Sequence, residues 1–124
     1  MKASIKKTIY GGILILIFLL LSFFGCGEKS HETWLNKGVA LYDLDQLDEA
    51  LEAFNKAIEI KPDYTFAWYN LACLYSLKKE KYKALKYLRK AIENGYKNLS
   101  HIRKDKDLDF IRNEKEFKEI IDKL

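Results

Sequence analysis

The sequence predicts an all-α protein: an α-α superhelix of two helix–turn–helix units, followed by a C-terminal capping helical segment. Three observations lead to this prediction. Residues 34–63 and 68–98 align with each other at a constant offset of 34 residues. Apolar side chains in both segments recur at steps of three and four residues, which places them on one face of a helix. Pro62 and Asn94–Gly95 provide helix ends after the two segments.

The N-terminal residues 1–25 have the layout of a secretory signal. The short basic stretch MKASIKK precedes an uncharged run at 8–27, which ends in small residues. A basic region, an apolar region and a small-residue site together are typical of an export signal. The Gly25–Cys26 pair resembles a bacterial lipobox, although Phe23–Phe24 stands where an aliphatic and a small residue are usual. The resemblance implies a lipoprotein-type signal, cleavage before Cys26 and a lipidated (palmitate-bearing) Cys26.

The alternative is an uncleaved signal anchor, because the 20 uncharged residues can cross a hydrocarbon core about 30 Å thick. Three lysines precede the run, and the positive-inside bias keeps such a terminus in the cytoplasm. Both hypotheses place the residues after Gly27 on the extracytoplasmic (periplasmic or extracellular) side of a cell membrane or an outer membrane. Residues 26–30 then form a short linker, which keeps the domain close to the lipid.

The two aligned segments resemble the tetratricopeptide repeat, a helix–turn–helix unit of 34 residues. The family pattern runs Trp, Leu, Gly, Tyr, Ala, Phe, Ala, Pro. The first copy, residues 31–64, carries Trp34, Gly38, Ala50, Phe54, Ala57 and Pro62. The second copy, residues 65–97, carries Trp68, Leu71, Ala72, Tyr75, Ala84, Leu88 and Ala91. The pattern departs at Lys37 and Leu41 in the first copy, and at Tyr96, which replaces the proline, in the second.

Small residues recur at three aligned positions: Gly38 and Ala72, Ala50 and Ala84, Ala57 and Ala91. They allow two helices to approach closely, and larger side chains there would overpack the contact by about 1–3 kcal/mol each. Two repeats are usually too few to bury a continuous core. We therefore expect residues 98–124 to complete it as a C-terminal helical cap whose polar face meets solvent. The apolar residues available for this are Leu108, Ile111, Phe117, Ile120 and Ile121.

No catalytic constellation, phosphate-binding loop or metal-ligand spacing is present in the sequence, so we expect neither an enzyme nor a cofactor or metal site. Asp105, Asp107, Asp109 and Glu116 do occupy positions of an EF-hand calcium loop, but Phe110 stands where the loop needs glycine. The favoured interpretation is a helix start with Asp105 or Asp107 as its N-cap. Cys73 aligns with Val39, which favours a small buried side chain over redox chemistry.

Charge separates along the chain. The net charge of +4 falls to +1 without residues 1–25, so the basic character is poor support for nucleic-acid binding. Residues 31–63 carry a net charge of −5 and residues 78–97 a net charge of +6. Lys83, Lys86 and Lys90 share one helix face, which is either a solvated face or a contact with an anionic surface.

The resemblance implies a membrane-anchored, extracytoplasmic scaffold or adaptor that binds proteins, with no nucleic acid and no small-molecule substrate. The alternative is a structural accessory lipoprotein of a cell-envelope assembly, packed through its outer helix faces. The family geometry places a partner-binding groove on the first helix of each repeat, at Leu35, Val39, Tyr42, Phe66, Tyr69, Asn70, Cys73 and Leu77. The Lys and Asn with which some such domains grip a carboxylate correspond to Leu35 and Val39, so this grip is absent. These residues could instead cover one another in a solenoid too short for a groove.

Overall fold

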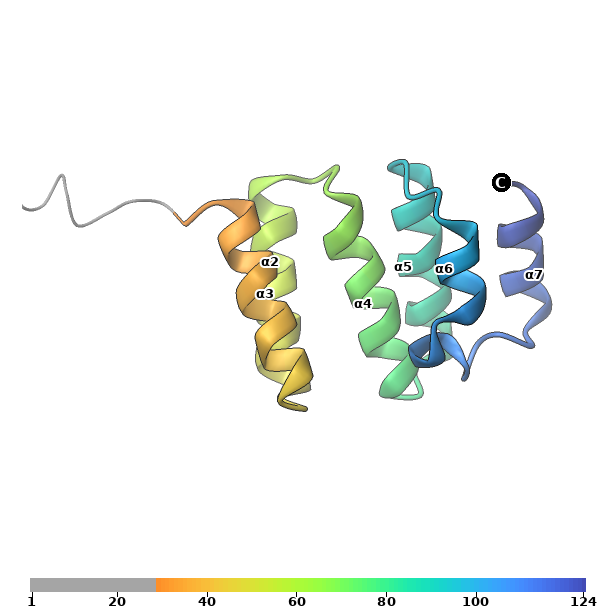
Figure 1. The fold of residues 1–124 in the computed structure, drawn as a ribbon, viewed down its shortest axis with the longest axis horizontal. Coiled ribbons are helices and arrows are strands. Elements are labelled where there is room, and N and C mark those ends of the chain that lie inside the picture. Colours follow the sequence, from red (N-terminus) through yellow and green to blue (C-terminus); the bar gives the residue numbers. More distant parts are fainter. Residues whose placement is uncertain (1–28) are drawn as a thin grey trace, which may run out of the picture.

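The computed structural model of the protein describes residues 29–124, and all regular elements in this part of the chain are helices. The elements are α2 (His31–Asp43), α3 (Leu47–Ile60), α4 (Thr65–Leu77), α5 (Lys81–Glu93), α6 (Leu99–Lys104), the 3-10 helix η1 (Lys106–Leu108) and α7 (Lys115–Asp122). They form a row along the long axis (Figure 1), in which α2 packs against α3 and α4 against α5. The predicted all-α superhelix is confirmed.

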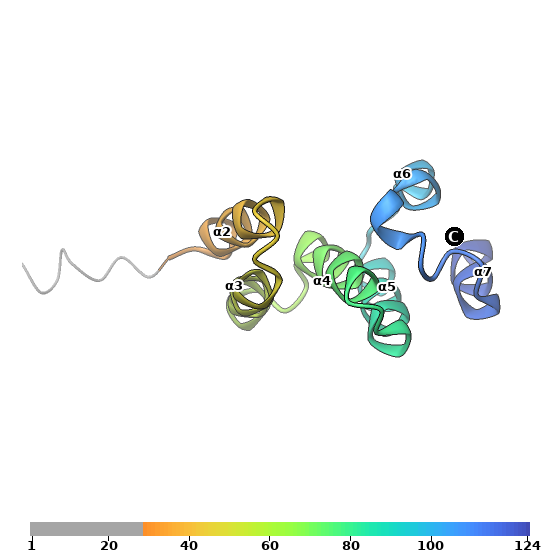
Figure 2. The same cartoon turned by 90° about the horizontal axis from the view of Figure 1, so that it is seen from below.

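The helix starts keep the 34-residue period beyond the two predicted copies. The first helices of successive units begin at His31, Thr65 and Leu99. The second helices begin at Leu47, Lys81 and Lys115. The tail is therefore built as a third, shortened unit, although α6 and α7 lie apart from each other, unlike the helices of the two full hairpins (Figure 2).

The same backbone motif ends α2 and α4. Asp45 and Lys79 adopt φ values of 60° and 61°, in the left-handed region that side chains other than glycine usually avoid. In both turns the next amide bonds back to the helix, from Gln46 to the carbonyl of Leu41 at 2.9 Å and from Glu80 to that of Tyr75 at 2.9 Å. This is the six-to-one bond of a Schellman motif, which satisfies carbonyls at a helix C-terminus.

The two predicted helix ends are both confirmed. Helix α3 ends at Ile60, two residues before Pro62, whose ring cannot continue a helix. Helix α5 ends at Glu93, and Gly95 follows with a φ of 104°. The amide of Tyr96 then bonds to the carbonyl of Ala91 at 2.9 Å, which completes the same terminal motif.

Small residues bring the helices of each hairpin together, as predicted. A Cβ atom on Gly38 would overlap the ring of Phe54, so α2 and α3 can approach this closely only with glycine at position 38. The equivalent pair in the second repeat is Ala72 and Leu88, and both are fully buried. A smaller side chain on α5 thus leaves room for a methyl group on α4.

The tail belongs to the main hydrophobic core, as predicted. Leu108 and Ile111 are completely buried, and Phe117, Ile120 and Ile121 are at most 6% exposed. The 3-10 helix η1 packs against α4, and α7 packs against α5. The tail therefore covers apolar surface that the second repeat would otherwise expose to water.

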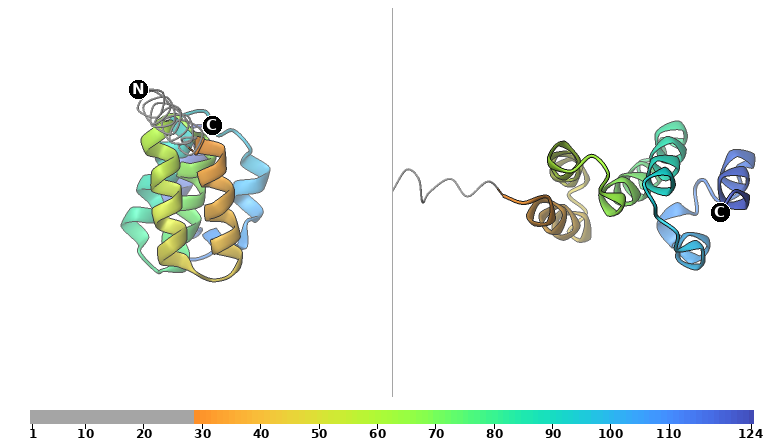
Figure 3. Two further views of the ribbon diagram at one scale, coloured as in Figure 1. Left: turned by 90° about the vertical axis from the view of Figure 1, so that its left-hand side faces the viewer. Right: turned by 90° about the horizontal axis from the view of Figure 1, so that it is seen from above.

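The predicted signal or anchor at 1–25 and the lipidated Cys26 lie outside the described residues. Viewed from the end at which the chain enters the fold, α2 and α3 form the outermost pair (Figure 3). Ser30 is the N-cap of α2, because its Oγ accepts a hydrogen bond from the amide of Thr33 at 3.2 Å. Within residues 29–124, no helix combines the length and the apolar character needed to span a bilayer.

Candidate functional site

The inner side of the row is the candidate interaction surface. Helices α2 and α6 stand on either side of α4, whereas α3 and α5 lie behind them (Figure 2). Helices α2, α4 and α6 are the first helices of the three units, and the sequence places the groove on two of them, α2 and α4. The 3-10 helix η1 continues α6 and packs against α4.

The eight predicted groove residues have very different exposures. Tyr69 and Cys73 are buried, at 5% and 3% exposed. Val39, Phe66 and Leu77 are exposed, at 37%, 54% and 39%. The remaining three are partly buried: Leu35, Tyr42 and Asn70. The fold thus divides the predicted site into a covered part and an open part.

Asp105 covers the middle of α4. The hydroxyl of Tyr69 donates to Oδ2 of Asp105 at 2.7 Å, and the Sγ atom of Cys73 lies 3.7 Å from the same oxygen. Burial raises the pKa of Tyr69, and nearby Cys73 and the bond to Asp105 raise it further. The other oxygen of Asp105 accepts the amide of Asp107 at 3.0 Å, so Asp105 is the predicted N-cap, here of η1.

A second carboxylate from the tail reaches α2. The hydroxyl of Tyr42 donates to Oδ2 of Asp107 at 2.7 Å. Burial raises the pKa of Tyr42, and the bond to Asp107 adds to the shift. Two tail carboxylates therefore accept the hydrogen bonds of the tyrosine hydroxyls on the first helices of both repeats.

Aromatic side chains cluster beside the first turns of α4. Tyr96, in the connection from α5 to α6, stacks on Tyr69 with 4.4 Å between ring centres and an angle of 8° between the planes. Its hydroxyl lies 2.7 Å from Nδ1 of His101. Phe66 contacts the edge of Tyr96 at 6.1 Å between ring centres. The sequence marks Tyr96 only as a departure from the repeat pattern, whereas in the structure its side chain contacts both Tyr69 of the second repeat and His101 of the tail.

The buried cysteine does not have the surroundings of a nucleophile. Burial raises the pKa of the Cys73 thiol well above its ordinary value, and the charge of Asp105 contributes to the shift. A reactive cysteine needs the opposite environment, with positive charge or a base that favours the thiolate. Cys73 therefore packs as a neutral side chain, as its alignment with Val39 predicts.

The acidic segment at 105–116 has structural partners of its own. The guanidinium group of Arg112 donates to the backbone carbonyls of Arg103 and Asp105 and to Oδ1 of Asp109, the last at 2.8 Å. The positive charge of Arg112 thus pairs with Asp109, one of the four acids that the calcium loop pattern would use as a ligand. In residues 29–124, no three His, Cys, Asp or Glu side chains gather as a possible metal site.

The basic residues of α5 are partly paired with acids: Lys90 lies 3.9 Å from Glu93, whereas Lys86 makes no ion pair among residues 29–124. Lys83 pairs with Glu80 at 2.6 Å, and Arg89 pairs with Glu116 of α7 at 2.5 Å. Lys81 pairs with Glu114 at 2.9 Å. These pairs are solvent-exposed, so each contributes little to stability. They favour the solvated-face interpretation over contact with an anionic surface.

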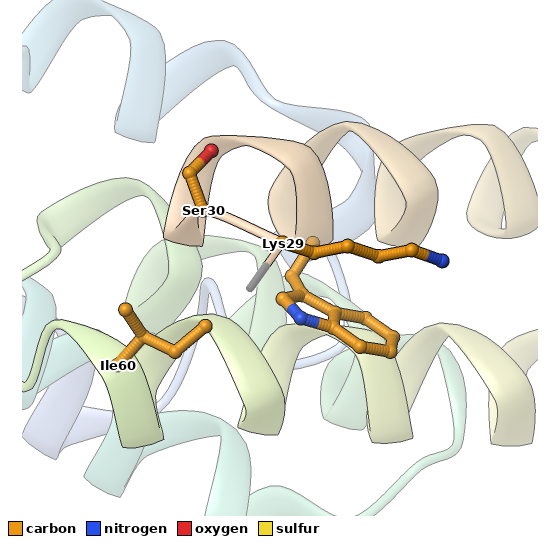
Figure 4. A pocket seen from close by; sticks show the side chains of 4 residues that line it. Lys29, Ser30 and Ile60 are labelled. Atoms are coloured by element: carbon orange, nitrogen blue, oxygen red, sulfur yellow. The ribbon is translucent and has the colours of Figure 1, made fainter. Parts of the chain in front are cut away.

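A separate shallow hollow lies where the chain enters the fold. Its lining residues are Lys29, Ser30, Trp34 and Ile60, from the start of α2 and the end of α3 (Figure 4). The Nζ atoms of Lys29 and Lys37 lie 5.4 and 5.1 Å from the centre of the Trp34 ring. None of the eight predicted groove residues lines this hollow.

Comparison with known proteins agrees with the repeat architecture. Two profiles of the tetratricopeptide repeat match the chain, one over residues 31–64 and the other over residues 53–86. A chloroplastic protein from Arabidopsis thaliana is 32% identical over 93 residues, which are 73% of this chain and 28% of that protein. "Tetratricopeptide repeat-containing protein trd-1" from Caenorhabditis elegans is 30% identical over 66 residues, which are 53% of this chain and 9% of that protein.

A shorter archaeal protein is also similar. "Uncharacterized protein MJ0572" from Methanocaldococcus jannaschii is 46% identical over 44 residues, which are 36% of this chain and 51% of that protein. In each of these comparisons the chain spans about half or less of the relative's length. The similarity thus concerns the helical repeats. Residues 31–86 therefore match the tetratricopeptide repeat in sequence, and the helices of this part of the chain follow one another as in that repeat.

Proposed function

We propose that the protein is a non-catalytic adaptor, held at a membrane, that binds a segment of a partner protein on the open part of its inner face. Tetratricopeptide repeats generally mediate protein–protein interaction, and two overlapping matches to this repeat cover residues 31–86 of the chain. The observation that carries the proposal is the exposed apolar set on the inner helices. It consists of Val39 on α2 and of Phe66 and Leu77 on α4.

The contacts of the tail limit which predicted groove residues are available to a partner protein. Tyr42, Tyr69 and Cys73 contact Asp107 or Asp105 of the same chain, so they hold the fold together. The partner then contacts Leu35, Val39, Phe66, Asn70 and Leu77. The amide of Asn70 donates to the carbonyl of Phe66 at 2.9 Å, so the open surface is mainly apolar. Aromatic and aliphatic anchors commonly dominate such contacts, at about 2 kcal/mol or more for the best residues.

Site-specific photo-crosslinking in native membranes tests this proposal. We expect a photoreactive phenylalanine analogue at position 66 or 39 to give a discrete crosslinked product with a second protein. The same analogue at Leu44, which is 70% exposed and lies at the end of α2, is the matched control. Equal products at positions 66 and 44, or products at neither 39 nor 66, would contradict the inner-face proposal.

Position 82 decides between this proposal and the accessory-lipoprotein alternative. Tyr82 on the second helix of the second repeat is 78% exposed, the largest exposure of any big apolar side chain among residues 29–124. A structural component packed through its outer faces would place a neighbour over Tyr82. Crosslinking from position 82 without crosslinking from 39 or 66 is the result that favours this alternative.

The membrane tether rests on the sequence of residues 1–28. We propose that Cys26 carries a diacylglyceryl group, that residues 1–25 are removed, and that the domain lies on the extracytoplasmic side of the cell membrane or outer membrane. Mass spectrometry of the protein isolated from membranes checks this directly. An intact N-terminus, together with unchanged membrane attachment in Cys26→Ser, would refute lipidation and favour the uncleaved anchor.

A further inference from the structure

Trp34 and Trp68 hold the same position in the two repeats but have different surroundings. The indole N–H of Trp68 donates to the carbonyl of Pro62 at 2.8 Å, and its ring stacks on Tyr87 at 5.7 Å. Trp68 also packs against the main hydrophobic core. Trp68 therefore has both an apolar neighbour for its ring and an oxygen that accepts its indole hydrogen. Both are supplied by residues outside α4.

In the first repeat Ala53 holds the position of Tyr87, so the second helix offers Trp34 no aromatic ring to stack on. Trp34 lines the hollow at the start of α2 with Lys29, Ser30 and Ile60 (Figure 4). Ile60 is 48% exposed. A partly exposed tryptophan beside an exposed isoleucine is therefore open at this end of the row.

The charges of the first repeat are arranged along its axis. Lys29 and Lys37 lie beside the Trp34 ring, with their Nζ atoms 5.4 and 5.1 Å from its centre. Asp43, Asp45 and Asp48 lie at the opposite end of the hairpin, in or next to the turn between α2 and α3. Glu32, Glu59 and Asp63 lie at the end of the hairpin that holds the hollow, so only part of the net charge of −5 over residues 31–63 lies far from it.

The residues that precede Lys29 indicate what lies next to this end of the domain. The uncharged run at 8–27 ends two residues before Lys29. Residues 28–30 connect this run to α2. Three extended residues span only about 10 Å. A chain held at a bilayer by this run or by a lipid on Cys26 keeps the start of α2, and the Trp34 hollow beside it, close to the lipid headgroups.

We propose that Trp34 and Ile60, flanked by Lys29 and Lys37, form a lipid-contacting surface that seats this end of the domain in the headgroup layer. The inference rests on the proposed membrane tether. Tryptophan favours the membrane interface because its ring is apolar and its N–H still finds an acceptor. Phospholipid ester carbonyls and phosphates supply the acceptor that Pro62 supplies to Trp68. Lysine stems cover apolar surface while their ammonium groups reach the phosphates.

Depth-dependent fluorescence quenching tests the inference, because Trp34 and Trp68 are the two tryptophans of the chain. The full chain is isolated from membranes and reconstituted into vesicles of phosphatidylcholine and phosphatidylglycerol. Trp68→Phe isolates the emission of Trp34, and Trp34→Phe isolates that of Trp68 as the matched control. We expect a nitroxide in the lipid headgroup region to quench Trp34 and to leave Trp68 almost unchanged. Circular dichroism checks that both variants keep their helices.

Three other results are informative. Vesicle-bound protein with equal quenching of both tryptophans overturns the inference and leaves the tether intact. Protein that does not float with the vesicles refutes the tether itself, and so the two failures are distinguishable. Trp34 shielded from the nitroxide lipid and from aqueous acrylamide, with concentration-dependent crosslinks between chains, would show that a second copy covers the surface and would also overturn the inference.

Discussion

The hydroxyl of Tyr42 in α2 donates to Asp107 in the tail, across 65 residues of sequence, with 2.7 Å between the two oxygens. Tyr69 makes the corresponding bond to Asp105 at 2.7 Å. The first helices of both repeats are thus tied to one short segment of the tail. This arrangement makes the inner face and the tail one structural unit, so a substitution at either tyrosine tests folding before it tests partner binding.

The first prediction concerns the bond between Tyr42 and Asp107. Hydrogen bonds to charged groups contribute about 1.5–3 kcal/mol, and this one is only partly buried. We therefore expect Tyr42→Phe to lower the free energy of unfolding of residues 29–124 by about 1–2 kcal/mol. Chemical denaturation followed by circular dichroism measures it.

A double-mutant cycle separates this bond from other effects of the substitution. Asp107→Asn alone should destabilise as well, and the double variant should lose less than the sum of the two single losses, because both remove one interaction. Strict additivity would show that the two side chains do not interact in solution.

The second prediction concerns alkaline pH. Burial is the main cause that raises the pKa of Tyr42 and of Tyr69 above the ordinary value of 10.0. The folded state therefore keeps protons that the unfolded state releases above that pH. Stability is complete below about pH 10 and falls above it, by up to about 1.4 kcal/mol per tyrosine one pH unit higher.

Denaturation midpoints on either side of this pH check the prediction. The variant with both Tyr42→Phe and Tyr69→Phe is less stable at neutral pH, but its stability should fall less steeply with pH above about 10. Identical slopes for the variant and the wild type would contradict the assignment of the pH dependence to these two hydroxyl groups.

Much of the fold could be predicted from the sequence because its main features repeat. Apolar and small residues recur at the same places in two copies of 34 residues, and Pro62 and Gly95 mark two of the helix ends. The burial of Phe117 and Ile121 was also predictable, since apolar residues at helical spacing in a polar tail need a surface to cover.

The covered half of the candidate site could not be predicted in the same way. It depends on bonds from Tyr42 and Tyr69 to carboxylates 65 and 36 residues away, and no periodic pattern records such a pairing. Helix α6 has only six residues, which is too short for a reliable amphipathic pattern. Asp105 and Asp107 were recognised as possible helix caps, but their tyrosine partners become visible only in three dimensions.

The third prediction is that the tail is essential for stability. Phe117 is 4% exposed in the core between the second repeat and α7. We expect Phe117→Ala to lower the free energy of unfolding by about 3 kcal/mol, through lost apolar burial and the cavity left behind. Phe110 lies in the same tail but is 37% exposed, so Phe110→Ala should cost less than about 1 kcal/mol.

Truncation after Lys97 tests the same point without a point substitution. It removes Leu108, Ile111 and α7 together, and it exposes the apolar surface of α4 and α5 that they cover. We expect a lower midpoint of thermal unfolding for the truncated domain. A truncated domain that melts at the temperature of residues 29–124 would show that the tail does not contribute to the core.

The last prediction exchanges a packing pair between the two repeats. Gly38 faces the ring of Phe54 in the first repeat, and Ala72 and Leu88 hold the same positions in the second. Alanine is favoured over glycine in a helix by about 1 kcal/mol, but Gly38→Ala would overpack the buried ring at a cost of about 1–3 kcal/mol. Because Phe54 is fully buried and has little room to move, we expect a net loss of stability.

Combining Gly38→Ala with Phe54→Leu reproduces the pair of the second repeat. Phe54→Leu alone leaves space beside Gly38 and should destabilise. In the double variant the new methyl group fills part of that space and the helix gains the propensity of alanine. We therefore expect the double variant to be more stable than the sum of the single losses predicts, by a coupling of about 1 kcal/mol or more in denaturant titrations. A double variant that loses the full sum would show that the spacing between α2 and α3 is fixed by other contacts.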